Sequence, residues 1–187
     1  DIDTTEKLIG EFASELAAVI IDPLSTAAGL TLPDADFLSR LRQVTEDHGI
    51  LLIFDEIVCF RVHSGGAHSM LDVRPDLITL GKVVAGGTPA AVFGGRQDVM
   101  SLFDPSGGKA RILQSGTFNG NPLSLTAGLL TLERMTPAVY DDINTRTRRL
   151  ADALQGVFDE VGIAARVCAI GSLFRIYFLE EIPRNYR

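Results

Sequence analysis

With 187 residues, of which 46% are hydrophobic and 22% charged, the chain is long enough to bury a sizeable core and has the composition of an ordinary globular protein. Its formal net charge of −7 argues against nucleic acids and anionic membrane surfaces as partners, because both repel an acidic protein. No apolar stretch is long enough to span a bilayer and no targeting signal is visible, so we expect a cytoplasmic protein.

The first part of the chain alternates apolar runs with a helical pattern. Residues 16–22 are apolar, partly β-branched and followed by a proline, which predicts a short buried strand. Residues 34–48 place their apolar side chains on one helical face, and Asp34 is of a type that caps helices. Residues 49–56 are apolar without alternation, as expected of a parallel strand covered on both faces.

The rest of the chain continues this alternation. Residues 76–82 and 90–95 are predicted strands joined by a glycine-rich turn. Helical spacing follows over residues 122–135 and 138–161, and residues 170–181 return to strand composition. Together these elements predict an α/β fold with a mostly parallel sheet flanked by helices.

Three predicted strands end in a charged residue: Asp22, Asp55 and Lys82. Parallel sheets bind ligands just beyond the carboxyl ends of their strands, so these ends would meet at one crevice. A carboxylate directly after an apolar strand needs a cation, and Asp55 with Lys82 could form a simple ion pair. Alternatively, Lys82 could bind an aldehyde cofactor while Asp55 keeps a pyridine ring protonated. Spacing alone does not choose between an ion pair and a cofactor site.

Three ordered segments carry a resemblance to a known family. They are "LLIFDEI" (51–57), "PDLITLGKVVAGGTPAAVFGGR" (75–96) and "SGTFNGNPLSLTAG" (115–128). They resemble the class III aminotransferases, fold-type I enzymes that depend on pyridoxal 5'-phosphate. The most similar patterns are those of the glutamate-1-semialdehyde 2,1-aminomutases and the β-amino-acid aminotransferases.

The resemblance implies a role for four residues. Lys82 would bind the cofactor covalently and move a proton between substrate and cofactor, while Asp55 would partner the pyridine nitrogen. Ile57 would pack against the ring, and Thr117 would reach the cofactor phosphate of the neighbouring subunit, which implies a homodimer. The implied substrate is a small amine or amino acid.

The resemblance also implies an organisation. Residues 1–136 would be part of the large cofactor-binding domain of a fold-type I transferase. Residues 137–187 would be a connecting helix and an incomplete small α+β domain, since family members are longer at both ends. A catalytically incompetent fragment or pseudoenzyme is therefore the alternative from another functional class.

Two features leave the substrate open. The turn "DEIVCFR" (55–61) is one residue shorter than in most aminomutases and matches the β-amino-acid aminotransferases. "AGGTPAAVFGG" (85–95) and "FNGNPL" (118–123) instead resemble the aminomutases.

The remaining candidate ligands fit no metal site. Cys59 and Cys168 match no metal or redox spacing and are expected to be free thiols. His63 and His68 lack a third ligand at a suitable spacing, so we expect loop histidines and no metal.

Overall fold

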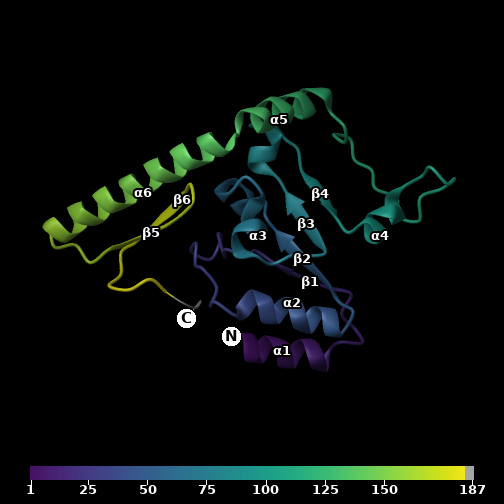
Figure 1. The fold of residues 1–187 in the computed structure, drawn as a ribbon, viewed down its shortest axis with the longest axis horizontal. Helices are drawn as coiled ribbons and strands as arrows, with labels where there is room; N and C mark the ends of the chain where they lie inside the picture. Colours follow the sequence, from purple (N-terminus) through teal and green to yellow (C-terminus); the bar gives the residue numbers. More distant parts are fainter. Residues whose placement is uncertain (184–187) are drawn as a thin grey trace.

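The structure is a computed structural model that describes residues 1–183. At its centre lies a four-stranded sheet of order β1-β2-β3-β4 (Figure 1). The strands are β1 (Ala18–Ile21), β2 (Leu51–Asp55), β3 (Leu77–Leu80) and β4 (Val92–Gly95). The first three are parallel and β4 is antiparallel, which confirms the predicted mostly parallel α/β sheet.

Two helices cover one face of this sheet. α2 (Phe37–Asp47) packs its buried side chains Leu38 and Leu41 into a core shared with Leu52 and Phe54 of β2. α1 (Ile2–Glu11) lies beside α2, on its far side from the sheet (Figure 1). The predicted cap at Asp34 is wrong, because α2 begins after Asp36 and the Asp34 main-chain oxygen accepts the Phe37 N–H instead.

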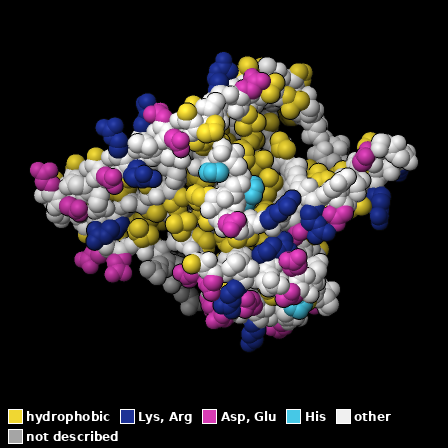
Figure 2. All heavy atoms as spheres, viewed as in Figure 1, with side chains coloured by type: hydrophobic (Ala, Val, Ile, Leu, Met, Phe, Trp, Pro, Cys, Tyr) yellow, Lys and Arg dark blue, Asp and Glu magenta, His cyan; other side chains and the backbone are white. Residues whose placement is uncertain are grey.

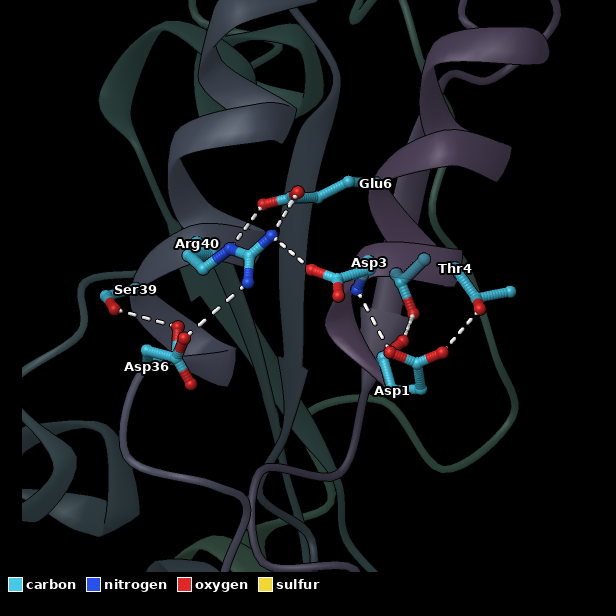
Figure 3. Close-up of polar contacts among 8 residues, drawn as sticks. Asp1, Asp3, Thr4, Glu6, Asp36, Ser39 and Arg40 are labelled. Carbon is cyan, nitrogen blue, oxygen red and sulfur yellow. Dashed lines mark hydrogen bonds and ion pairs between the residues drawn. The ribbon is translucent and has the colours of Figure 1, made fainter.

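An arginine joins α1 to α2. The guanidinium of Arg40 donates hydrogen bonds to both carboxylate oxygens of Glu6, at 2.9 and 2.6 Å, and to Asp3 at 2.6 Å (Figure 3). These groups are partly exposed, so the contact orients the helices more than it stabilises them. The apolar residues Ile2 and Ile9 of α1 supply the buried area that holds this helix in place.

Short helices connect the strands at the carboxyl edge of the sheet. They are η1 (Cys59–Val62), α3 (Gly66–Leu71) and η2 (Lys82–Ala85). At the far end of the sheet, α4 (Gln97–Met100) and η3 (Ser101–Phe103) lead into a loop that projects from the molecule (Figure 1). None of these short elements was predicted, because each is too brief to show a helical period.

Helix α5 (Pro122–Arg134) packs directly on η2. A Cβ atom on Gly128 would lie 2.4 Å from the carbonyl oxygen of Val84, and one on Gly86 would lie 2.3 Å from that of Ala127. The two backbones therefore approach more closely than a side chain would allow. Five leucines of α5 are exposed: Leu123, Leu125, Leu129, Leu130 and Leu132. Figure 2 shows hydrophobic side chains on the surface where α5 lies.

A C-terminal unit follows the sheet. It consists of α6 (Pro137–Glu160) and an antiparallel hairpin of β5 (Arg166–Ile170) and β6 (Leu173–Tyr177). Arg61 Nε donates to Ser172 Oγ at 2.9 Å, which ties the hairpin to the turn after β2. The expected unit of residues 137–187 extends past the described part, since residues 184–187 lie outside it. Among residues 1–183, no helix combines the length and apolarity that crossing a membrane requires.

Candidate active site

The carboxyl ends of β1, β2 and β3 lie at one edge of the sheet, as their parallel register requires. Asp22 follows β1, Asp55 ends β2, and Lys82 comes two residues after β3. Asp55 pairs in register with Thr79, so the strand that carries Lys82 is its direct neighbour. The structure thus brings the predicted acid and lysine to the same edge.

Asp55 is half-buried and uses one of its two carboxylate oxygens within the protein. Its Oδ1 accepts hydrogen bonds from the Ile57 N–H at 3.1 Å and from Thr79 Oγ1 at 3.3 Å. No residue in the described part donates to Oδ2. This oxygen is therefore available to an external donor, and the other two bonds fix the orientation of the carboxylate.

Lys82 opens η2 with a left-handed backbone, at φ 49°, and its side chain is exposed. An extended residue, Gly81, precedes it. Of the two alternatives that the spacing left open, the direct ion pair between Lys82 and Asp55 does not form among residues 1–183. The Lys82 amine is therefore open to water and is not held by a neighbouring carboxylate in the described part of the chain.

Ile57 lies against the segment that carries Lys82. A Cβ atom on Gly81 would sit 3.3 Å from Cγ2 of Ile57, so Ile57 occupies the space that a side chain at position 81 would need. Ile57 and Asp55 are both half-buried and are separated by one residue. The edge of the sheet thus combines a carboxylate, an aliphatic side chain and a primary amine.

Thr117 does not join this group. It is exposed in a turn ahead of α5, and no hydrogen bond in the described part links it to Asp55, Ile57 or Lys82. The start of α5 is itself anchored near the glycine turn after Lys82, because Ser124 Oγ donates to the Pro89 carbonyl at 3.0 Å.

Sequence reasoning missed two residues of this edge, Thr79 and Glu56. Thr79 could have been found from its register with Asp55, which the parallel pairing of 49–56 with 76–82 implies. Glu56 is fully buried and accepts hydrogen bonds from α3, and the dipeptide "DE" gave no sign of this.

Other polar residues nearby have structural roles. Asp22 accepts the Leu24 N–H at 3.1 Å and the Thr26 N–H at 2.7 Å, so its carboxylate caps the loop after β1. Burial, and then the neighbouring Asp22 and Glu56 carboxylates, raise the pKa of the Cys59 thiol well above its usual range. Cys59 is therefore a neutral, buried thiol.

The two histidines differ from expectation in one respect. His68 lies in α3 rather than in a loop, and its ring contacts Glu56. His63 accepts the Gly65 N–H at 3.0 Å. Residues 1–183 contain no cluster of three side chains that could hold a metal ion.

A family model described as "Aminotransferase class-III" matches residues 2–186. This chain belongs to the class III aminotransferases. The solved structures similar to this class III chain include an omega-transaminase from Sphaerobacter thermophilus, with 44% identity and a TM-score of 0.94 over 97% of the chain. They also include a β-phenylalanine aminotransferase from Variovorax paradoxus, with 35% identity and a TM-score of 0.91 over the whole chain.

A third similar structure is a glutamate-1-semialdehyde-aminomutase from Pseudomonas aeruginosa, with 28% identity and a TM-score of 0.85 over the whole chain. This class III chain spans only 41% of the omega-transaminase, 43% of the β-phenylalanine aminotransferase and 42% of the aminomutase. The fold-type I architecture, as far as this chain covers it, is thereby confirmed.

Proposed function

We propose that the protein transfers amino groups with pyridoxal 5'-phosphate as its cofactor. The observation that carries the proposal is the arrangement of Asp55, Ile57 and Lys82 at one edge of the sheet. Family membership and the similarity to a transaminase with pyridoxal phosphate bound, at 34% identity, support it.

The residues present fit this cofactor. A protonated ring nitrogen needs a carboxylate oxygen, and Oδ2 of Asp55 has no donor in the described part. A flat ring needs an apolar surface, which Ile57 supplies beside the backbone of Gly81. An aldehyde needs a primary amine, and Lys82 presents one at the end of the neighbouring strand.

The bound cofactor would supply an electron sink for the carbon that bears the substrate amino group. Asp55 would hold the proton on the ring nitrogen, because a carboxylate in hydrogen-bond contact favours the charged form of its partner. Ile57 would exclude water from one face of the ring. Lys82 would take a proton from the substrate carbon at Nζ and return it, as general base and then general acid.

We propose a small amine or β-amino acid as the donor and a keto acid as the acceptor. The shortened turn 55–61 and the higher identity to the omega-transaminase and the β-phenylalanine aminotransferase support transfer between two substrates. The second candidate is an aminomutase, which the sequences of 85–95 and 118–123 favour.

We further propose that the enzyme is a homodimer in which Thr117 serves the site of the neighbouring subunit. Its exposed turn lies directly ahead of the N-terminus of α5 and offers hydrogen-bond donors to a phosphate. This proposal accounts for the absence of a hydrogen bond between Thr117 and Lys82 in the described part of the chain.

The test uses the protein at its natural full length, loaded with pyridoxal phosphate. We expect β-phenylalanine, as the probe donor, to bleach the cofactor absorbance in one half-reaction, and pyruvate to restore it. An aminomutase would convert glutamate-1-semialdehyde without an added acceptor. If neither β-phenylalanine nor glutamate-1-semialdehyde alters the absorbance of the loaded protein, the proposed amino transfer is wrong.

A further inference from the structure

Glu56 is a fully buried carboxylate directly after Asp55. Burial of an unpaired carboxylate is unfavourable, so such a group persists only where both oxygens find partners. Oε2 of Glu56 accepts the Ala67 N–H at 2.7 Å, and Oε1 accepts the His68 N–H at 3.0 Å. Oε1 also lies 2.7 Å from Nδ1 of His68, so the imidazole ring is a third polar group in contact with this carboxylate.

The start of α3 is shaped around this carboxylate. Gly66 has φ +82°, and a Cβ atom on it would lie 2.5 Å from Oε2 of Glu56. A side chain at this position would collide with the carboxylate and strain the backbone. Glycine at position 66 therefore allows two successive N–H groups, those of Ala67 and His68, to reach Glu56.

The main chain of Glu56 is held as firmly as its side chain. Its N–H donates to the Thr79 carbonyl at 3.0 Å, and its carbonyl accepts the Phe60 N–H at 3.0 Å. Glu56 thus connects three elements at the carboxyl edge: the end of β3, the start of α3, and the turn that leads into η1.

Burial alternates along β2 and continues past its end. Leu52, Phe54 and Glu56 are fully buried, whereas the intervening residues Asp55 and Ile57 are half-buried. Within β2, Asp55 therefore points away from the buried side chain of Phe54. Ile57 lies in the turn that follows, and its N–H donates to Asp55 Oδ1 at 3.1 Å, so anchoring Glu56 fixes the backbone that joins these two residues.

We propose that Glu56 is a positioning residue: its bonds to Ala67 and His68 hold the end of β2 so that Asp55 and Ile57 face the cofactor together. The inference rests on the proposed function, since it assigns a role toward the same cofactor. Replacing a residue that only stabilised the fold would lower the unfolding temperature but would not change how the folded protein binds the cofactor.

The test compares Glu56→Gln with the unmodified holoenzyme at full length, well below its unfolding temperature. Glutamine has the same size, but its Nε2 donor opposes an N–H donor at either Ala67 or His68. We expect the Kd for pyridoxal phosphate, from absorbance titration of the apoenzyme, to rise about tenfold, the loss expected of one hydrogen bond to a charged group. We also expect a shifted pH midpoint of the bound chromophore.

Asp76→Asn is the matched control for general destabilisation. Asp76 precedes β3 at the opposite edge of the sheet, and it is a buried carboxylate with hydrogen bonds of its own. We expect this variant to lower Tm while leaving the cofactor Kd and the chromophore midpoint unchanged.

His68→Ala provides a second variant in case Glu56→Gln does not fold. It removes the ring that lies against Oε1 and keeps both main-chain bonds to Glu56, so we expect a smaller rise in Kd in the same direction. The positioning role is wrong if the variant that folds has a lower Tm than wild type but the same Kd and the same chromophore midpoint. A full-length wild-type protein that binds no cofactor would instead refute the proposed function itself.

Discussion

Asp55 shows how a single side chain is prepared for a ligand at the end of a strand. Two donors, the Ile57 N–H and Thr79 Oγ1, share its Oδ1, so the carboxylate plane is fixed while Oδ2 stays open to an outside group. A ring nitrogen bound there would keep its proton because a carboxylate in hydrogen-bond contact favours the charged form of its partner.

The corresponding variant is Asp55→Asn. The amide has nearly the same shape but no charge, so it holds the proton on the ring nitrogen less well. We expect kcat to fall about 10- to 100-fold, as the loss of one charge-assisted hydrogen bond would produce. Steady-state kinetics of the full-length enzyme check this, with Asp98→Asn on the exposed surface of α4 as the control. A kcat within twofold of wild type would contradict the role of Asp55.

Among the helices and strands, the contact between α5 and η2 depends on the absence of a side chain at Gly128. A methyl group there would lie 2.4 Å from the Val84 carbonyl oxygen, so α5 would have to move away from the turn that carries Lys82. We expect Gly128→Ala to destabilise the protein by about 1–3 kcal/mol through overpacking.

Gly156 in α6 provides the matched control for this substitution. It is also a glycine inside a helix, but a Cβ atom on it would meet nothing within 4 Å. Gly156→Ala should therefore stabilise by about 0.5–1 kcal/mol, because alanine loses less backbone freedom on folding. Chemical denaturation measures both variants, and equal effects would contradict the close contact between α5 and η2.

The amino end of β3 is held by a second buried acid, Asp76. It accepts hydrogen bonds from the Leu52 N–H at 2.7 Å, from Arg42 at 2.8 Å and from Arg96 at 2.9 Å. Burial alone would raise the pKa of the Asp76 carboxyl, but the Leu52 N–H and the two guanidinium groups outweigh it and hold the pKa below its ordinary value. The ionised form therefore stabilises the fold.

This lowered pKa predicts a pH dependence. The stabilisation is complete above the unfolded-state pKa of about 4, and it is lost as the pH falls through the lower pKa of the folded protein. We expect Asp76→Asn to cost about 3 kcal/mol at pH 7 and much less near pH 2. Urea unfolding at the two pH values checks this, and an equal cost at both would contradict it.

Sequence reasoning predicted the elements with long or strongly apolar patterns and missed those defined by tertiary contacts. The apolar run 49–56 predicted β2 because burial alone selects a strand there. The expected lack of alternation was wrong, since β2 buries every second side chain more deeply. Helix α1 and strand β5 were missed because one is short and mostly polar and the other is stabilised by its pairing with β6.

The residues of the candidate site also fall into those that sequence motifs predict and one that depends on tertiary contacts. Asp55, Ile57 and Lys82 follow from motifs close to strand ends, so their common edge could be predicted once the strands were recognised as parallel. Glu56 could not be assigned in this way, because its partners Ala67 and His68 become neighbours only when α3 forms around it.

For the whole molecule, the proposed dimer predicts complementation between two defective subunits. Lys82→Ala removes the amine of one site, and Thr117→Glu would repel the phosphate of the site that Thr117 serves. If Thr117 acts across the interface, mixing the two variants creates heterodimers in which one site has both residues intact.

We therefore expect co-refolded or co-expressed Lys82→Ala and Thr117→Glu subunits to regain activity, up to about half of the wild-type value in a heterodimer with one working site of two. Each variant alone is the control and should be inactive or weak. Activity that does not exceed the sum of the separate variants would place Thr117 outside the neighbouring site.

Peptide mapping tests whether Lys82 binds the cofactor covalently. The full-length protein is loaded with pyridoxal phosphate, reduced with borohydride, digested and analysed by mass spectrometry. We predict the added pyridoxyl mass on the peptide containing Lys82, and its loss in Lys82→Ala but not in Lys109→Ala. The same mass on another lysine, or on none, would show that Lys82 does not bind the cofactor.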